Sequence, residues 1–486
     1  MQKPLILVTG ATGYVGGRLV PHLLAEGYRV RLLVRDEKRL QGRPWLGRVE
    51  VAEGDVLDPD TLAPALEGVE AAYYLIHSMS GDVNFHQRDL TAARNFGEAC
   101  KAQSVERIIY LGGLGDPLAD LSQHLQSRHQ TGEALRQTGV PITEFRAAVI
   151  VGSGSISFEM IRYLTERVPL MICPRWVYTR IQPIAIRDVL NYLVAALETP
   201  ESAGKIIEIG GSEVITYGDM MLGYAEIRGL KRILLPVPVL TPQLSSYWVH
   251  WVTPVSASIA RPLIEGLRNE VIVRDDQARQ LFPHLEPWDY RTAVEMALSD
   301  LDASQVETSW SDALVTSSGD VVPLVLTTQE GMILERRQRL VNSTPEHVFA
   351  IISRLGGDYG WLYFDWAWRL RGILDRMVGG VGFRRGRRDM YEVRVGDAVD
   401  FWRVEAVETD RLLRLRAEMK VPGSAWLQFD LQPGEEGQTR LTQTAFFAPK
   451  GLFGLVYWYL LYPFHSLIFS RLIQKISERA EALKLQ

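Results

Sequence analysis

The sequence predicts an α/β protein with a doubly wound parallel sheet and a small substrate lobe, followed by an α+β domain. The first observation is an apolar strand segment, Leu5 to Val8, that runs into a glycine turn and an amphipathic helix. The second is the alternation of apolar strand segments with helical segments over the first 150 residues, which favours a parallel sheet. The third is a change after residue 325 to strands of period two and a long terminal helix.

The composition excludes several classes of protein. A chain of 486 residues is too long for one core, so two or three domains are expected. A net charge of −5 gives no general attraction to nucleic acid or to anionic membranes. Cys100 and Cys173, the two cysteines, form neither a disulfide framework nor a metal-ligand spacing, which favours a reducing compartment. The N-terminus lacks the features of a signal peptide, so we expect a cytoplasmic protein. We also expect no bound metal and, because the chain has no basic domain, no nucleic-acid partner.

A turn with three glycines follows the first strand. Gly10 permits the sharp turn, Gly13 lets the backbone approach a pyrophosphate, and Gly16 lets the helix pack closely on the strand. The N-terminus of the following helix, which Gly27 closes, stabilises an anion. The turn therefore predicts a dinucleotide site formed by Gly10, Thr12, Gly13, Tyr14, Val15 and Gly16.

The spacing Gly-x-x-Gly-x-x-Gly after Thr9 resembles that of the short-chain dehydrogenase/reductase superfamily, in its extended or atypical branches. The second strand, VRLLVRD, ends at Arg35. An arginine there pairs with the 2′-phosphate of NADP, whereas an acid, such as the adjacent Asp36, is usual for NAD. We therefore expect NADP(H) as the cofactor, with NAD(H) as the alternative.

The same resemblance assigns roles at the ends of later strands. Asp55 and the backbone of Val56, after the third strand, are expected to meet the adenine. The fourth strand, AAYYLIHSM, ends at Ile76 and His77, where ligands of open α/β sheets bind. The fifth is RIIYLGGLG, and the sixth, in ITEFRAAVIVGSGS, brings Val149 to the nicotinamide.

The helix from about Ser122 to Gln137 departs from the superfamily at its catalytic positions. A tyrosine and a lysine four residues later are usual there, on one helix face, but this sequence has His124 and Arg128. The serine that often ends the fifth strand is also absent from LGGLG. Each member of the usual triad is therefore replaced.

The replacements can still carry chemistry. An imidazole titrates near neutral pH and can transfer a proton, and the fixed charge of Arg128 favours its neutral form. Arg128 can also hold ribose hydroxyls or a phosphate. We predict His124, Arg128 and His77 as catalytic residues; the alternative is a solvated helix face near the pocket. His129 lies one position off that face and is expected to face solvent.

Three functions fit these residues. The first is an NADP(H)-dependent oxidoreductase that acts on an apolar small molecule. The second is a redox sensor, because the chain also resembles atypical reductases of the nitrogen-metabolite repressor type, which lack the tyrosine and include members that only sense the dinucleotide. The third, a nucleotide-sugar epimerase, is supported by the extended-branch fold alone, and the absent tyrosine counts against it.

Residues 150–302 are expected to complete the first domain, 1–302, as a small substrate lobe. Thr216 is expected to be the N-cap residue of one helix, and Asp188 lies near the start of another. Tyr247, Trp248 and Trp251 lie in an apolar, proline-rich stretch and either line a pocket or form the core of the lobe.

Residues 303–325 are polar and serine-rich and are predicted to be a linker. The second domain, 326–486, has a strand, a helix capped by Ser343 or Thr344, four strands of period two and a terminal helix. This order is similar to that of START/Bet v 1-like helix-grip folds, in which the last helix encloses an apolar cavity. LRGILDRMVGGVGFRRGRRD and YWYLLYPFHSLIF also resemble a bacterial two-domain family that joins an atypical reductase to a domain of unknown function.

The terminal helix has two interpretations. Gly451 to Ile473 is long enough to span a bilayer, but Pro463 and His465 interrupt it. We expect burial on the sheet, with membrane contact as the alternative.

Two further sets of residues in the second domain are each open to two interpretations. The six tryptophans after the linker either line a cavity or form the core. The arginines of FRRGRRD either bind an anionic group or face solvent. They are Trp361, Trp366, Trp368, Trp402, Trp426 and Trp458, and Arg384, Arg385, Arg387 and Arg388.

Overall fold

The computed structural model contains two compact units, each with its own core. It describes residues 3–40, 43, 45–76, 85–116, 121–237, 265–302, 325–329, 332–357, 359–364, 371–373, 375, 393–434 and 437–483. The first unit holds the described residues up to Ser299, and the second holds residues 300–302 and those from Val325 to Leu483. Of the residues singled out from the sequence, His77, Tyr247, Trp248, Trp251, Trp366, Trp368, the FRRGRRD arginines and residues 303–324 lie outside the described part.

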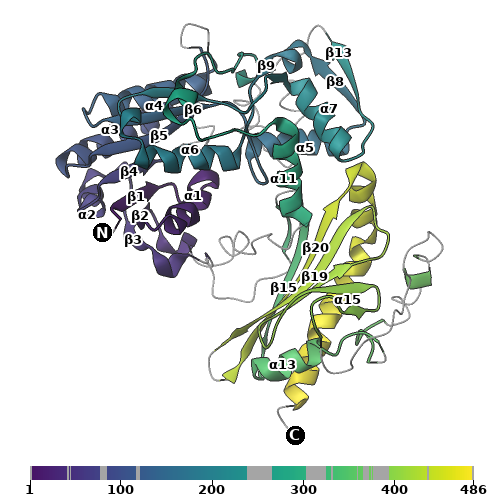
Figure 1. Ribbon diagram of the computed structural model, residues 1–486. Coiled ribbons are helices and arrows are strands. Elements are labelled where there is room, and N and C mark those ends of the chain that lie inside the picture. The colour runs from purple at the N-terminus through teal and green to yellow at the C-terminus, as the bar shows by residue number, and fades with distance from the viewer. Residues whose placement is uncertain are drawn as a thin grey trace. The chain divides into compact units, whose positions relative to one another are not determined.

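A parallel sheet of seven strands forms the centre of the first unit (Figure 1). Its order is β11-β6-β5-β4-β1-β2-β3, and neighbouring strands pair in parallel throughout. The strand order reverses between β1 and β4, and ligands of doubly wound sheets bind at such a point. The predicted fold class is confirmed. The strands are β1 (Leu5–Thr9), β2 (Arg29–Val34), β3 (Glu50–Glu53), β4 (Ala71–Tyr74), β5 (Arg107–Gly113), β6 (Ile142–Ala147) and β11 (Ile206–Ile209).

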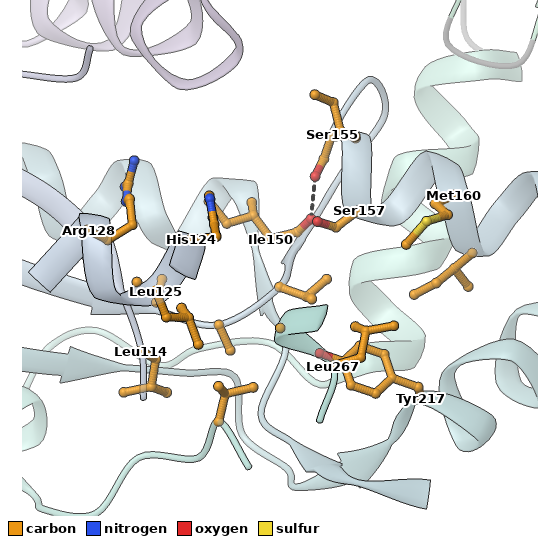
Figure 2. A pocket seen from close by; sticks show the side chains of 18 of the residues that line it. Leu114, His124, Leu125, Arg128, Ile150, Ser155, Ser157, Met160, Tyr217 and Leu267 are labelled. Atoms are coloured by element: carbon orange, nitrogen blue, oxygen red, sulfur yellow. Dashed lines mark hydrogen bonds between the residues drawn. The ribbon is translucent and has the colours of Figure 1, made fainter. Parts of the chain in front are cut away.

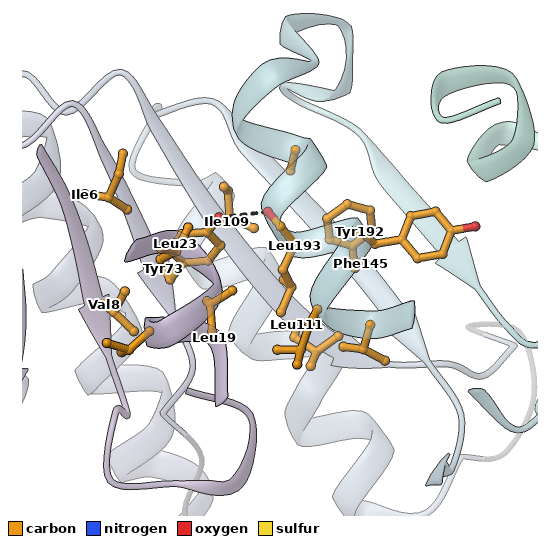
Figure 3. Packing of buried hydrophobic residues seen from close by; sticks show 14 of the residues in the cluster. Ile6, Val8, Leu19, Leu23, Tyr73, Ile109, Leu111, Phe145, Tyr192 and Leu193 are labelled. Atoms are coloured by element: carbon orange, nitrogen blue, oxygen red, sulfur yellow. Dashed lines mark hydrogen bonds between the residues drawn. The ribbon is translucent and has the colours of Figure 1, made fainter. Parts of the chain in front are cut away.

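Helices cover both faces of this sheet. One apolar cluster joins β1 and β5 to α1 (Tyr14–Ala25) and α6 (Ile186–Glu198), as Figure 3 shows for Leu19, Leu23 and Leu193. Within it, the buried hydroxyl of Tyr73 donates to the carbonyl of Leu193 at 2.8 Å (Figure 3). A second cluster on the opposite face takes residues from α2 (Leu62–Leu66), α3 (Phe85–Ala102) and α4 (Gln123–Arg136). Strands buried on both faces explain why they are continuous apolar runs.

Short strand pairs and several helices form the lobe after β6. The pairs are β7 (Ile150–Val151) with β10 (Ile184–Ala185), β8 (Leu170–Pro174) with β13 (Ile233–Val237), and β9 (Arg180–Ile181) with β12 (Ile215–Thr216). The helices are α5 (Ile156–Arg167), α7 (Tyr217–Ile227) and the 3₁₀ turn η4 (Arg175–Tyr178), with α10 (Gln277–Leu281) and α11 (Tyr290–Asp302) after them.

Two polar side chains fix the lobe helices. Thr216 caps α7 in a reciprocal pair with Asp219, so the predicted cap is confirmed. Asp188, in the first turn of α6, is buried and accepts the backbone N–H of Trp288 at 2.8 Å. It therefore holds the later segment against the lobe.

An antiparallel sheet of seven strands, order β14-β15-β20-β19-β18-β17-β16, forms the second unit. The helix α13 (Pro345–Ile352) begins after its cap residue Thr344, and the terminal helix α15 spans Gly451–Leu483. α15 packs against α13, β15 and β20. The strands are β14 (Val325–Gln329), β15 (Met332–Val341), β16 (Ala398–Val399), β17 (Trp402–Glu408), β18 (Leu412–Ala417), β19 (Gly423–Pro433) and β20 (Thr439–Pro449).

Burial on the sheet accounts for only one side of α15. Leu455, Trp458 and Phe469 are buried in the core of the second unit together with Trp361 and Trp402, and Trp426 is also buried. The opposite side carries exposed apolar residues, and only 22% of the most apolar stretch is buried. By length and composition α15 is a helix that could cross a membrane. Burial on the sheet therefore accounts for part of the apolar composition of α15, and membrane contact stays the alternative.

Candidate functional site

The glycine turn lies at the switch point between β1 and β4. Gly10 has φ +71°, which favours glycine, and a Cβ added there would lie 2.6 Å from the carbonyl oxygen of Leu75. The N–H of Gly13 donates to the carbonyl of Gly10 at 2.8 Å and closes the turn. A Cβ at Gly16 would clash with that same carbonyl oxygen. Gly10 and Gly16 therefore each have a structural reason to be glycine, as the sequence predicts, whereas the role of Gly13 toward a pyrophosphate stays a prediction.

No side chain of the described residues caps the N-terminus of α1. Gly13 is the N-cap residue and supplies no capping side chain, so the N–H groups of the first turn are available to an anion. Tyr14 and Val15 begin the helix and are half-buried. This geometry fits the pyrophosphate of a dinucleotide.

The residues assigned to the adenosine end lie after β2 and β3. Arg35 directly follows β2 and is exposed, as a partner of a 2′-phosphate must be. Asp55 is half-buried, and its carboxylate accepts the N–H of Leu57 at 3.0 Å. The carbonyl of Val56 accepts from the Asn95 amide at 3.1 Å, so this loop is fixed to α3.

A cavity of about 300 Å³ joins the ends of β5 and β6 to the lobe (Figure 2). Predicted residues meet in it: Tyr14 from the glycine turn, His124 and Arg128 from α4, and Val149 after β6. Its wall is otherwise mostly apolar, with Leu125, Ile150, Met160, Ile161, Leu164 and Leu267 among the lining residues. Such a cavity, apolar with a few polar groups, is typical of a small-molecule site.

Arg128 is held against the strand beneath it. Its guanidinium donates to the carbonyl of Leu111 and lies 5.5 Å from the ring centre of Tyr110. The Tyr110 hydroxyl in turn donates to the backbone carbonyl of Arg128 at 3.0 Å. The cation is therefore fixed at the cavity wall, next to His124 one helical turn earlier (Figure 2).

His129 differs from the prediction. Its ring is half-buried and its Nε2 donates to the carbonyl of Gly113, at the end of β5, over 3.0 Å. Burial lowers the pKa of His129, with the charge of Arg146 acting in the same direction, so the ring is held neutral. His129 therefore supports the strand end beside the cavity and does not face solvent.

Sequence reasoning missed the lobe side of the cavity. Ser155, Trp176 and Tyr217 line it from α5, η4 and α7. The hydroxyl of Ser155 donates to the carbonyl of Ile150 at 2.7 Å (Figure 2). The sequence could have indicated Tyr217 only through its position directly after the predicted cap Thr216, as the first residue of a helix.

The other predicted residues lie apart from this cavity. Thr12, Arg35, Asp55, Val56 and Ile76 do not line it, which agrees with roles toward the phosphate and adenosine parts of a dinucleotide. Among the described residues, no cluster of histidine, cysteine or acidic side chains could hold a metal ion.

Two family models match parts of the chain. Residues 10–151 match the model described as NAD(P)H-binding, and residues 332–472 match a protein family of unknown function. The first match, with the turn geometry, supports an NAD(P)-binding domain and the predicted dinucleotide cofactor, NADP(H).

The relatives each match about half of this chain. The photosystem II assembly factor Ycf39 of Trieres chinensis is 25% identical over 54% of this chain and 83% of its own length. A ceramide reductase of Caulobacter vibrioides is 28% identical over 49% of this chain and 74% of its own. The structure of a nucleoside-diphosphate-sugar epimerase from Staphylococcus aureus has a TM-score of 0.50 at 18% identity, covering 60% of this chain and 99% of that one. This last similarity concerns the fold alone.

Proposed function

We propose that the protein is an NADP(H)-dependent oxidoreductase that acts on an apolar small molecule. The observation that carries this proposal is the cavity that joins the predicted nicotinamide position at Val149 to an apolar wall, with His124 and Arg128 beside it. The Caulobacter relative is named a ceramide reductase, which agrees with reduction of an apolar substrate.

The cofactor's parts divide between the described groups. The first turn of α1 binds the pyrophosphate, Arg35 pairs with the 2′-phosphate, and Asp55 with Val56 meets the adenine. Arg35 favours NADP(H) over NAD(H), because its guanidinium is a permanent donor for a phosphate.

His124 is the proposed proton-transfer group. A bound nicotinamide supplies or accepts the hydride, so the protein must exchange one proton at the substrate oxygen. His124 lines the cavity, and an imidazole can both donate and accept a proton. Arg128 lies on the ribose side, and the same histidine is the base when an alcohol is oxidised.

Titration of the full chain with NADPH and with NADH tests the cofactor. We expect NADPH to bind more tightly, in the micromolar range, and Arg35→Ala to remove most of the preference. Turnover is then tested by following NADPH absorbance with a panel of apolar aldehydes, ketones and quinones. If neither dinucleotide binds tighter than millimolar, the proposed function is wrong.

A redox sensor is the second candidate. The observation in its favour is the replacement of tyrosine, lysine and serine by His124, Arg128 and the glycines at the end of β5. Dinucleotide binding without turnover of any compound in the panel would favour the sensor. An epimerase would need the missing tyrosine and is the least supported.

For the second unit we propose a helix-grip domain of the START/Bet v 1-like type, whose α15 contacts a membrane surface peripherally. The order β15, α13, antiparallel strands and α15 supports the fold. The exposed apolar side of α15 supports the membrane contact.

A further inference from the structure

We propose that the lobe wall of the cavity binds an oxygen atom of the substrate through the indole N–H of Trp176 and the hydroxyl of Tyr217. The substrate class is then an apolar molecule with an oxygen acceptor at the end remote from His124. This inference rests on the proposed function, because it concerns the same cavity.

The indole N–H of Trp176 is the first observation. Trp176 lines the cavity, and its Nε1 is buried without a hydrogen-bond partner among the described residues. A buried donor that stays unpaired costs about 1–3 kcal/mol, so a partner from outside the chain stabilises it. An acceptor atom of a ligand in the cavity provides that partner.

The hydroxyl of Tyr217 is the second observation. Tyr217 is 4% exposed and lines the same cavity. Burial raises the pKa of Tyr217, so the hydroxyl remains protonated and can donate. Figure 2 shows Tyr217 across the apolar middle of the cavity from His124 and Arg128.

Pairing of short strands brings the two donors to one wall. β9 follows η4 and β12 precedes α7, and the two strands pair at Ile181 with Ile215. The helix start also touches η4, since a Cβ at Gly218 would lie 3.5 Å from the side chain of Val177. Trp176 and Tyr217 lie next to these contacting residues in the chain, and both line the same cavity.

A pair of probes of equal shape tests the inference without turnover. Acetylnaphthalene carries a carbonyl oxygen where isopropenylnaphthalene carries a CH₂ group, so their affinities for the full chain differ mainly through that oxygen. We expect the affinity ratio of ketone to hydrocarbon to fall about tenfold in Tyr217→Phe and in Trp176→Phe. Tyr178→Phe, which removes an exposed hydroxyl outside the cavity, is the matched control and should keep the ratio.

The readout separates this inference from the proposed function. Fluorescence titration of the probes needs neither cofactor nor reaction, and NADPH affinity of each variant checks that the first unit is folded. An unchanged ratio in both variants, or failure of both probes to bind, overturns the inference and leaves the oxidoreductase testable by NADPH oxidation. Loss of NADPH binding in the parent chain overturns the proposed function and leaves the probe ratio interpretable.

Discussion

Gly16 determines whether the dinucleotide turn can close. A methyl group at this position would meet the carbonyl of Gly10, which is backbone and cannot move aside without opening the turn. We predict that Gly16→Ala weakens NADPH binding at least about tenfold, or about 1.4 kcal/mol, measured by fluorescence titration. Gly47→Ala is the control, because a Cβ there has no atom within 4 Å. Parent-like affinity in Gly16→Ala would remove the turn from the site.

His465 predicts how stability depends on pH. It is half-buried in α15 beside the rings of Trp458 and Phe469, and its Nδ1 is buried without a partner among the described residues. Burial, with the charge of Arg371, lowers its pKa to about 4. Between pH 6.5 and pH 4 the unfolded chain therefore binds one more proton than the folded chain, and the free energy of unfolding falls as the pH falls.

The expected loss for this histidine is about 2 kcal/mol between pH 7 and pH 5, and none above pH 7. Denaturant unfolding of the parent and of His465→Phe at both pH values measures it. Glu335, whose pKa burial raises, acts with the opposite sign, so the difference between the two proteins is the quantity to compare. Equal pH dependence in both would contradict the buried neutral imidazole.

The sequence could predict the parts of the site that depend on short-range spacing, but not the lobe side of the cavity, which depends on long-range contacts. The glycine turn and the positions of His124 and Arg128 follow from short-range spacing, which is why their places could be expected. His129 was misplaced because its contact with Gly113 depends on how α4 lies on β5. Trp176 and Tyr217 were missed because their meeting depends on the pairing of β9 with β12, 34 residues apart at Ile181 and Ile215.

At the scale of elements, α15 has one face buried in the core of its unit and an opposite face that is exposed and apolar. Its exposed side forms an apolar stripe, in which Phe453, Leu460 and Phe464 are 73%, 72% and 65% exposed. Lys450 precedes the stripe and Arg471 follows it, so cations lie at both ends. The stripe is Leu452, Phe453, Val456, Tyr459, Leu460, Phe464 and Leu467. An amphipathic face of this kind suits the surface of an anionic bilayer.

We predict that the full chain floats with vesicles that contain phosphatidylglycerol and binds neutral phosphatidylcholine vesicles more weakly. Replacing Phe453, Leu460 and Phe464 together by glutamate should reduce the bound fraction at least about tenfold, since each loses apolar area and adds repulsion. Leu340→Glu, at an exposed position of β15, is the control. A stripe that instead joins two copies of the chain would give a concentration-dependent dimer in light scattering and no flotation.

The element order was largely predictable, because strands buried on both faces and strands of period two leave distinct patterns. The helix around Ser122–Gln137 and the terminal helix appear close to the expected bounds. The two-residue strands of the lobe were not predictable, since a pair such as β7–β10 depends on long-range contact and has too few residues for a period.

For the whole molecule, two separate cores predict two unfolding transitions. The clusters of the first unit contain none of the described residues of the second, so each core can melt by itself. Leu193→Ala and Leu427→Ala, both at fully buried positions, should each lower the free energy of unfolding of one unit by about 2–5 kcal/mol. The transition that moves in each variant then identifies the unit to which it belongs.

NADPH at 100 times its dissociation constant adds about 2.7 kcal/mol to the free energy of unfolding of the unit that binds it, which raises the midpoint of that transition by roughly 5 °C. Calorimetry of the full chain should therefore show the transition lowered by Leu193→Ala move with NADPH while the other stays. A shift of both transitions by the same amount would mean that the two units unfold as one, and that the second unit responds to the dinucleotide state of the first.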